Sequence, residues 1–414
     1  MYKRCSSGNC DKVLELHSRE MACPDCGDLL ELVVESPVYG PAELKKLWRD
    51  RRTSDDPRDL SGVWRFREVL PQYGADEVVT MAEGNCPLVQ GHKSATWAGV
   101  QNLRFKHLGW NPTACFKDLG MTVGVTEARH VGATAVGCAS TGNTSGSMAA
   151  YAARAGIKAR VFLPAGAVSM AKLAQSLDYG AEVVQIQGNF DNALDELLNG
   201  GDPELYFLNS INPYRIEGQK TVMYELMEQC GWNPPDYVVV PGGNLGNSSA
   251  FGKALMEMKD FGLIEKVPRL VVVQAAGANP FARAWREHAD KVVPVLDPHT
   301  DATAIRIGAP KSWKKATRGV QFSQGTVTDA TDVEIGEAKA VIGRDGIGCE
   351  PASAATLAGI RKLVDEGWLE RDADIVAVLT GHVLKDTDYI VKRHKREHED
   401  SAAHKDYAID CCVH

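Results

Sequence analysis

The chain has 414 residues, of which 44% are hydrophobic and 24% are charged, and its formal net charge at pH 7 is −8. This composition is that of a folded protein of two or three domains and excludes a disordered chain. The acidic balance argues against a nucleic-acid partner or an anionic membrane surface, because both need clustered Lys and Arg. We therefore expect small molecules as ligands.

Four cysteines lie near the N-terminus in two pairs, Cys5 with Cys10 and Cys23 with Cys26. The residues between the pairs read as a hairpin strand, and four thiolates suit tetrahedral zinc. We predict a zinc-ribbon-like module over residues 1–35 with a structural zinc ion on these cysteines. Unmetallated thiols on a mobile tail are the alternative, and His17 is a substitute ligand.

No signal-peptide pattern and no apolar run of roughly eighteen residues occurs in the sequence. The remaining cysteines are dispersed, which is typical of reduced thiols. We expect a cytoplasmic protein with no membrane partner; the sequence leaves its oligomeric state open, with a homodimer as a candidate.

Short apolar strands alternate with helices through most of the chain, after a charged helical region at 40–75. This alternation predicts open parallel sheets, which place ligands at the carboxyl ends of their strands. A helix is expected at 118–130 and another through 149–151. The strands are expected at 133–137, 159–163, 181–186, 206–208, 237–240, 270–273 and 375–379.

Lys117 lies between a turn, Asn111 to Cys115, and the start of the helix expected at 118–130. A lysine amine attacks a carbonyl well when burial or nearby cations lower its pKa. We interpret Lys117 as a Schiff-base lysine and pyridoxal 5′-phosphate as its carbonyl partner. A surface lysine in front of a helix is the alternative.

A glycine-rich turn follows the strand expected at 237–240 and precedes a helix. Glycines let backbone amides approach a phosphate at a helix N-terminus. The turn matches neither the Walker A motif nor the G-x-G-x-x-G fingerprint. We predict that it cradles the phosphate of pyridoxal phosphate. Its residues are Gly243, Asn244, Leu245, Gly246 and Asn247.

Several motifs in this order resemble fold-type II pyridoxal-phosphate enzymes, and within them the threonine synthase family, from about residue 60 to 390. They are Glu83 to Leu88, Phe116-Lys117-Asp118, Ser140-Thr141-Gly142-Asn143, Asn209 to Thr221, Gly243 to Asn247, Ala304 to Gly308 and Thr380 to Asp386. The resemblance implies an α/β fold of two open parallel-sheet domains, like the tryptophan synthase β chain. A large cofactor-binding domain would span 36–128 and 215–390, a small mobile α/β domain 129–214, and a charged tail 391–414.

The resemblance also implies roles for residues around the cofactor. Lys117 would bind the cofactor covalently and, once released by the substrate, move protons. Asn143 would face the cofactor's O3′, and Ser140, Thr141 and Thr144 would receive the substrate carboxylate. Helix capping by these polar residues is the alternative.

Thr380 would meet the pyridine nitrogen, where other pyridoxal folds use a carboxylate, so a less protonated ring is expected. A threonine that only caps its strand is the alternative reading.

Arg215 would bind a substrate phosphate with Asn209 and Ser210, and Arg306 is a second candidate for that role. Either arginine could instead belong to a surface ion pair. The sequence departs from the family at Cys86, where Thr is usual, and at Cys115, where Ser is frequent.

The activity implied is conversion of O-phospho-L-homoserine and water to L-threonine and phosphate. A cysteate synthase acting on phosphoserine, a threonine dehydratase and a catalytically idle cofactor-binding relative stay open as alternatives.

Overall fold

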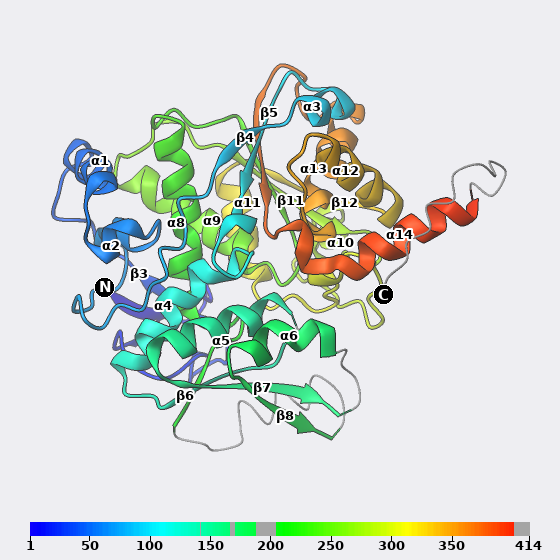
Figure 1. Cartoon of the computed structure of the whole chain (residues 1–414). Helices are drawn as coiled ribbons and strands as arrows, with labels where there is room; N and C mark the ends of the chain where they lie inside the picture. The colour runs from blue at the N-terminus through cyan, green and yellow to red at the C-terminus, as the bar shows by residue number, and fades with distance from the viewer. Residues whose placement is uncertain (141, 166–169, 188–203, 401–414) are drawn as a thin grey trace.

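The computed structural model describes residues 1–140, 142–165, 170–187 and 204–400, whose strands form three sheets (Figure 1). The strands are β1 (Tyr2–Cys5), β2 (Val13–Leu14), β3 (Leu30–Val33), β4 (Leu88–Gln90), β5 (Asn102–His107), β6 (Ala135–Cys138), β7 (Lys158–Pro164), β8 (Glu182–Ile186), β9 (Leu205–Phe207), β10 (Tyr237–Pro241), β11 (Arg269–Ala275), β12 (Thr326–Ala330) and β13 (Asp374–Leu379).

The α-helices are α1 (Pro41–Asp50), α2 (Pro57–Leu60), α3 (His92–Ala98), α4 (Lys117–His130), α5 (Asn143–Ala155), α6 (Met170–Asp178), α8 (Pro213–Gln229), α9 (Gly246–Asp260), α10 (Pro280–Arg286), α11 (Trp313–Phe322), α12 (Asp332–Arg344), α13 (Pro351–Asp365) and α14 (Thr387–Asp400). The short 3₁₀ helices are η1 (Arg51–Thr53), η2 (Trp64–Val69), η3 (Leu108–Trp110), η4 (Thr303–Ile305) and η5 (Val383–Asp386). Thr141 and most of the predicted charged tail, residues 401–414, lie outside the described residues.

The largest sheet has six strands in the order β12-β11-β10-β13-β5-β4. All neighbours are parallel except β4, which runs antiparallel to β5 at the edge. The parallel sheet was predicted, whereas β4, β5 and β12 were not. In β5 the apolar pattern is interrupted by Lys106, which is buried and paired with Glu225 of α8.

Alternate residues of the central strands enter two different cores, one on each face of the sheet. Val238 and Val240 pack in the core that includes α8, α9 and α11. Tyr237 and Val239 pack in the core that includes α12 and α13. A parallel strand covered on both faces is apolar at every position, which explains the continuous Tyr-Val-Val-Val run.

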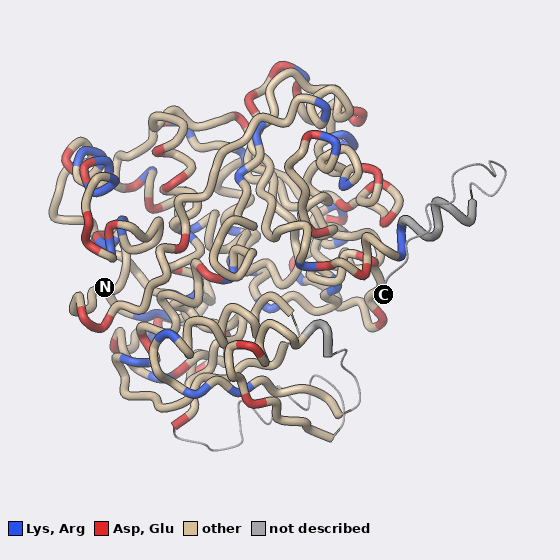
Figure 2. The backbone as a smooth tube through the Cα atoms, in the orientation of Figure 1, with Lys and Arg blue, Asp and Glu red and all other residues tan. Residues whose placement is uncertain are grey.

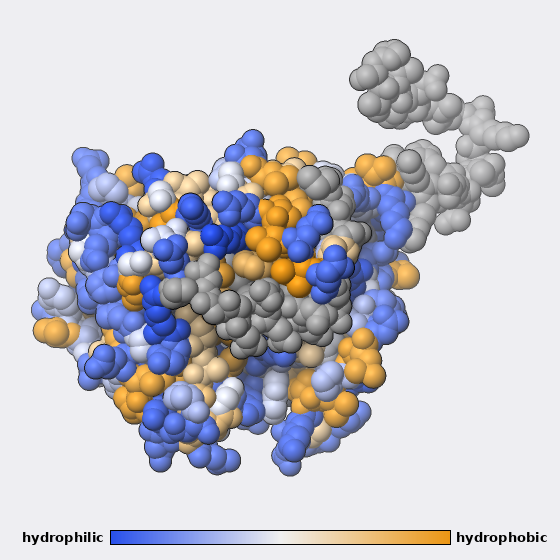
Figure 3. All heavy atoms as spheres, turned by 90° about the horizontal axis from the view of Figure 1, so that it is seen from below, coloured by the Kyte–Doolittle hydropathy of each residue, from blue (hydrophilic) through white to orange (hydrophobic). Residues whose placement is uncertain are grey.

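A second, wholly parallel sheet has the order β8-β7-β6-β9 and lies at the bottom of Figure 1. Val136 of β6 and Val161 of β7 pack with Met121 of α4 and Met148 of α5. Helices α4 and α5 therefore lie between the two sheets. Seen from below, the described surface mixes hydrophilic residues with separate hydrophobic groups (Figure 3).

The N-terminal residues form a small antiparallel sheet, β2-β1-β3, so the hairpin strand predicted between the cysteine pairs is present. This module rests on the helices of the large sheet. Lys253 of α9 donates to the Leu32 carbonyl at 2.6 Å, and Arg318 of α11 pairs with Glu31. Helix α14, which carries the start of the predicted tail, projects from the other side of the molecule (Figure 1).

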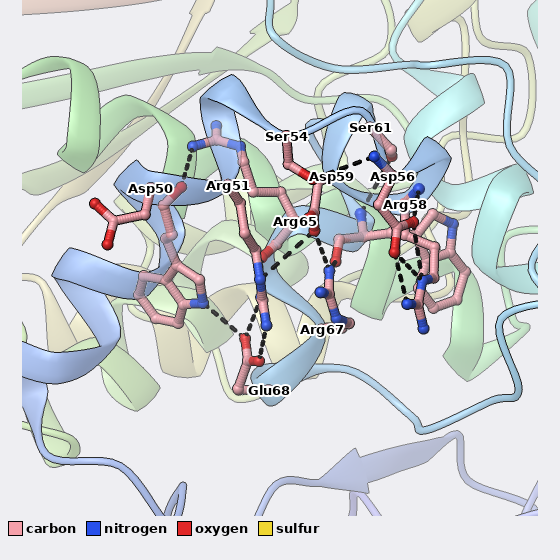
Figure 4. A network of polar contacts seen from close by, with 12 residues as sticks. Asp50, Arg51, Ser54, Asp56, Arg58, Asp59, Ser61, Arg65, Arg67 and Glu68 are labelled. Atoms are coloured by element: carbon pink, nitrogen blue, oxygen red, sulfur yellow. Dashed lines mark hydrogen bonds and ion pairs between the residues drawn. The ribbon is translucent and has the colours of Figure 1, made fainter.

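The region from α1 to η2 is fixed by a network of ion pairs (Figure 4). Arg51 donates to Glu68 at 2.8 Å, and Arg67 pairs with Asp59. Arg65 pairs with Glu228 at the end of α8 and so attaches the region to the large sheet's helices.

Basic and acidic residues are interspersed over the described backbone (Figure 2). Within the described ranges, no helix is long and apolar enough to cross a membrane. The domain boundaries given above stay a prediction.

Candidate active site

A cavity of about 1060 Å³ opens where the carboxyl ends of the two parallel sheets meet. It is lined by segments that follow β6, β9, β10 and β13 and by the starts of α4, α5 and α9. Apart from Thr141, which lies outside the described residues, every residue predicted for the cofactor or the substrate lines this cavity. These are Lys117, Ser140, Asn143, Thr144, Asn209, Ser210, Arg215, Gly243, Asn244, Leu245, Gly246, Asn247, Arg306 and Thr380.

Lys117 is the first residue of α4, and its amine reaches the cavity. The turn before it is fixed to the strand end, because the Phe116 N–H donates to the Thr380 carbonyl at 2.9 Å. Burial, followed by the charge of Arg215, lowers the pKa of Lys117 to about 8. A lysine of lowered pKa has more of the neutral, nucleophilic amine at neutral pH.

The turn is also held from inside α4 by Asp118. Its carboxylate accepts from the Thr113 N–H at 2.7 Å and from the Ser147 hydroxyl of α5 at 2.5 Å. Burial raises the pKa of Asp118 to about 6. Asp118 therefore ties the lysine turn to α5.

The loop after β6 leads to the N-terminus of α5, which points at the cavity with Ser140, Asn143 and Thr144. The N-cap residue is Gly142, which has no side-chain cap, and its own N–H donates to Ser140 Oγ at 3.4 Å. The capping alternative therefore does not apply to Asn143 and Thr144. The Asn143 amide donates to Glu350 Oε2 at 2.9 Å. The first turn of α5 thus offers backbone N–H groups and hydroxyls to an anion.

The glycine-rich turn after β10 is held by its own asparagines. Asn244 donates to Ser210 Oγ at 2.6 Å and accepts from the Lys311 N–H at 2.6 Å. Asn247 donates to the Pro241 carbonyl at 2.8 Å. Because these side chains support the turn, the groups left to receive a phosphate are the backbone amides at the start of α9.

Two residues of the glycine-rich turn show how its backbone comes close to the cavity. Leu245 has a φ of 63°, a left-handed conformation that turns the chain into α9. A Cβ on Gly243 would lie 3.2 Å from the Ala304 carbonyl, so the turn packs tightly against the opposite wall. The turn therefore brings its backbone close to the cavity, as a phosphate cradle requires, and the cradle itself stays a prediction.

The two predicted phosphate-binding arginines occupy different environments. Arg215 is 2% exposed, donates to the Leu208 carbonyl at 2.9 Å and leaves its Nε without a partner. Burial lowers its pKa to about 10. Because Arg215 is buried, the surface ion-pair alternative is wrong for it. Arg306 is exposed at the cavity mouth.

The neutral donors predicted to accompany Arg215 are partly committed to the protein. Asn209 Oδ1 accepts from the Ala139 N–H at 3.0 Å, and Ser210 Oγ accepts from Asn244.

Gln175, Gln219, Glu350 and Lys385 are among the cavity residues to which the sequence reasoning gave no role. Lys385 belongs to the quoted Thr380 to Asp386 motif and could have been chosen from it. Glu350 precedes Pro351 at the start of α13, where a polar side chain is typical of an N-cap. The sequence carries no local sign that Glu350 points into a cavity instead.

The two cysteines that depart from the family lie behind the cavity wall. Cys115 is buried next to Lys117, and burial raises the pKa of its thiol to about 11. Cys86 is buried and its Sγ lies 3.3 Å from the Asn111 amide. Both are neutral packing groups here.

The four N-terminal cysteines converge as predicted, with all sulfur atoms within 4.8 Å of one another. Cys5 and Cys26 sulfurs are 3.4 Å apart, and Cys10 and Cys23 sulfurs 3.7 Å. Thiolates about 2.3 Å from one tetrahedral zinc ion lie about 3.8 Å apart, so the spacing fits zinc. His17 is not part of this cluster, because it pairs with Glu127 at 2.9 Å.

The cavity fits pyridoxal phosphate by the chemistry of its donors. It combines a lysine of lowered pKa, backbone amides at a helix start, and buried polar atoms without partners, Arg215 Nε and Gln219 Oε1. Unpaired buried polar atoms are costly and indicate an absent polar ligand. Fold and site together define a pyridoxal-phosphate type of enzyme.

Comparison with known proteins agrees with this class. Residues 79–381 match the family model of the pyridoxal-phosphate dependent enzymes. Threonine synthase of Methanocaldococcus jannaschii is 44% identical over 395 residues, 95% of each chain. Threonine synthase of Methanosarcina acetivorans is 43% identical over 371 residues, 89% of each chain. The chain belongs to the threonine synthase family of pyridoxal-phosphate dependent enzymes.

The fold is also shared with a solved structure, threonine synthase from Escherichia coli. The TM-score is 0.71, with 18% identity over 94% of this chain and 91% of the other. The predicted fold-type II architecture is therefore confirmed.

Proposed function

We propose that the chain converts O-phospho-L-homoserine and water to L-threonine and phosphate. The observation that carries the proposal is the shared cavity, in which Lys117, the glycine-rich turn and the buried Arg215 meet. The glycine-rich turn alone would bind the phosphate of the cofactor. Arg215 is a separate cationic group in the same cavity, and it supports a substrate that carries a phosphate of its own.

Each group of residues has a task in this reaction. The amides of Gly243 to Asn247 hold the cofactor phosphate, and the cofactor supplies an electron sink for carbanions next to the amino-bearing carbon. The start of α5 with Ser140 and Thr144 binds the substrate carboxylate. Arg215 binds the phosphate that leaves from the γ-carbon.

Lys117 is the base that the geometry supports. Its amine, of pKa about 8, takes the α-proton of the substrate and carries protons among the substrate carbons while phosphate leaves and water adds at the β-carbon. Closure of the small domain over the cavity would exclude bulk water, which would otherwise protonate the substrate at the wrong carbon.

The test is to incubate the purified, cofactor-loaded protein with O-phospho-L-homoserine and to measure phosphate and threonine. Equal yields are expected, and Lys117→Ala should abolish both. Turnover of O-phospho-L-serine in place of this substrate, deamination of threonine, or a bound chromophore without any turnover would contradict the proposal.

We also propose that Cys5, Cys10, Cys23 and Cys26 bind one structural zinc ion. The sulfur spacing supports this, and no fifth ligand is offered by the described residues around the cluster. The cytoplasmic location and the homodimer are kept as predictions from the sequence.

A further inference from the structure

A short loop of the N-terminal module lies against α4 and α8, the helices of the cavity lysine and of the buried arginine. This loop, residues 16–18, follows β2, and we call it the module loop. The Lys3 amine of β1 donates to the Ser18 carbonyl and so ties the loop to the sheet of the module. Cys10 precedes the loop and Cys23 follows it, so the position of the loop depends on the cysteine cluster.

The contact with α8 is made at the first turn of that helix. The Tyr214 hydroxyl donates to the Leu16 carbonyl, and Tyr214 is fully buried. The Lys3 amine lies 4.9 Å from the centre of the Tyr214 ring, a distance at which a cation is attracted to an aromatic face. Arg215 is the next residue of the helix. The module loop therefore holds the turn of α8 from which Arg215 reaches the cavity.

The contact with α4 is made near the end of that helix. His17 Nδ1 lies 2.9 Å from Glu127 Oε2, and the Tyr73 hydroxyl donates to the same oxygen at 2.7 Å. The Glu127 side chain is fully buried. Helix α4 begins with Lys117, so the module loop contacts both the helix of Lys117 and the helix of Arg215.

Helices α4 and α8 are packed backbone to backbone. A Cβ on Gly218 of α8 would lie 1.8 Å from the Leu119 carbonyl oxygen of α4, so only glycine allows this approach. A Cβ on Gly120 of α4 would lie 2.9 Å from the Arg215 carbonyl oxygen. Elements packed this closely transmit small displacements to each other. The module loop therefore contacts one packed unit that supplies Lys117 and Arg215 to the cavity.

The guanidinium of Arg215 has little side-chain support of its own. Its Nη1 donates to the Leu208 carbonyl at 2.9 Å, and its Nε has no partner among the described residues. The backbone N–H groups of Tyr214 and Arg215 donate to Asn212 Oδ1 at 2.9 Å and 3.3 Å. The placement of the guanidinium therefore depends on where the first turn of α8 is held.

The module is also attached to the large sheet's helices at a second place. Lys253 of α9 donates to the Leu32 carbonyl at 2.6 Å, and Arg318 of α11 pairs with Glu31. These contacts involve β3 and not the module loop. A change at Tyr214 therefore removes the contact of the loop and leaves the attachment of β3 in place.

We propose that the module loop positions Arg215, through the hydrogen bond from Tyr214 to the Leu16 carbonyl, for binding a phosphate group in the cavity. Tyr214 does not line the cavity and acts only through Arg215, so it is a positioning residue. The proposal rests on the proposed function where it identifies the ligand as a phosphorylated substrate. Because the cysteines hold both ends of the loop, metal loading of the cluster and phosphate affinity are coupled.

Phosphate affinity of the cofactor-loaded protein tests this without turnover. Tyr214→Phe removes only the hydroxyl and should raise the Kd of inorganic phosphate about five- to tenfold, measured by isothermal titration calorimetry. The matched control is Tyr224→Phe, which also removes a buried hydroxyl bond on α8, to Glu257 at 3.0 Å. It should leave the Kd unchanged. In an Arg215→Lys background, Tyr214→Phe should have no further effect.

Metal removal gives a second readout. Chelation of the reduced wild-type protein should raise the Kd of phosphate about as far as Tyr214→Phe does, and it should add nothing in that variant. With O-phospho-L-homoserine, Tyr214→Phe should raise KM and keep kcat within about twofold, as expected for weaker ground-state binding. If Tyr214→Phe does not fold, His17→Leu, which removes the contact of the loop with Glu127, should raise the Kd in the same direction.

An unchanged Kd in Tyr214→Phe, an equal rise in Tyr224→Phe, or additive effects with Arg215→Lys would overturn the proposal. A wild-type Kd retained after metal removal would also overturn it. A holoenzyme that shows the expected changes in phosphate affinity but makes no threonine would support the role of the module loop and refute the proposed function.

Discussion

Lys385 Nζ donates to Gln175 Oε1 at 2.6 Å and so joins the segment after β13 to α6, beside the four-stranded sheet. Both residues line the cavity. Lys385 also donates to the Thr113 carbonyl, 3.2 Å away, in the turn before Lys117. The pair therefore connects the two walls of the cavity near the lysine turn.

Gln175→Leu keeps the size of the side chain and removes the acceptor. We expect KM for O-phospho-L-homoserine to rise about tenfold, because a hydrogen bond to a charged group contributes roughly 1.5–3 kcal/mol. Steady-state kinetics measure this. Lys392→Met, which removes an exposed ion pair with Asp301, is the control and should leave KM unchanged. An unchanged KM in both variants would show that the contact does not hold the walls together.

Arg215→Lys keeps a positive charge and removes the planar fork. We expect kcat/KM for the phosphorylated substrate to fall about 100-fold, since a lysine cannot replace two-point phosphate binding in a buried site. Arg306→Lys, at the exposed mouth, should cost at most a few-fold. Rates and inhibition by inorganic phosphate are the measurements. A larger loss at Arg306 would transfer the phosphate site to the mouth of the cavity.

The lowered pKa of Lys117 predicts a pH-dependent stability of the cofactor-free protein. The folded-state pKa is about 8 and the ordinary value is 10.5. Between these pH values the unfolded chain binds more protons than the folded chain, so the free energy of unfolding rises with pH across this window. Below about pH 8 the amine is charged in both states, and the folded protein carries the full cost of burying that charge.

Lys117→Met should remove the cost of burying a charged amine. The cofactor-free variant should be more stable than wild type at pH 7 by roughly 3 kcal/mol or less, and the difference should shrink as the pH rises toward 10.5. Denaturant unfolding at several pH values measures it. Exposed Lys291→Met is the control. Equal stability of Lys117→Met and wild type at pH 7 would contradict a lowered pKa of Lys117.

Metal removal should affect stability through the N-terminal module. We expect one zinc ion per chain by elemental analysis and a lower Tm, by several degrees, after chelation or in Cys26→Ser. The reason is that the module's strand β3 rests on α9 and α11 through Leu32 and Glu31. Cys230→Ser, outside the cluster, should keep the metal and the Tm. A metal-free protein with an unchanged Tm would count against the zinc site.

Much of the fold was predictable because its signals are local. The central residues of β10, β11 and β13, at 237–240, 270–273 and 375–379, form continuous apolar runs, as expected for strands covered on both faces. Strand β5 escaped prediction because Lys106 interrupts its pattern, and only the packing of Glu225 against it makes a buried lysine acceptable. The antiparallel edge strand β4 is three residues long and gives too short a pattern to detect.

Parts of the candidate site could likewise be predicted from local patterns. Lys117 and the turn at Gly243 to Asn247 were selected from the sequence, since a lysine before a helix and glycines after a strand are contiguous patterns. The different burial of Arg215 and Arg306 could not be predicted, because it depends on the helices that pack around α8. Zinc ligation was predicted from spacing along the chain, and the fold then showed that His17 is used elsewhere, by Glu127.

The order of residues alone determined the alternation of strands and helices, the lysine at the start of a helix and the glycine-rich turn after a strand, because backbone conformation and periodicity are set by near neighbours. Only the tertiary structure placed Glu350 against Asn143, 207 residues away, and Lys385 against Gln175, 210 residues away. Those contacts exist because two sheets meet at their carboxyl ends, and no local pattern encodes which side chains then face each other.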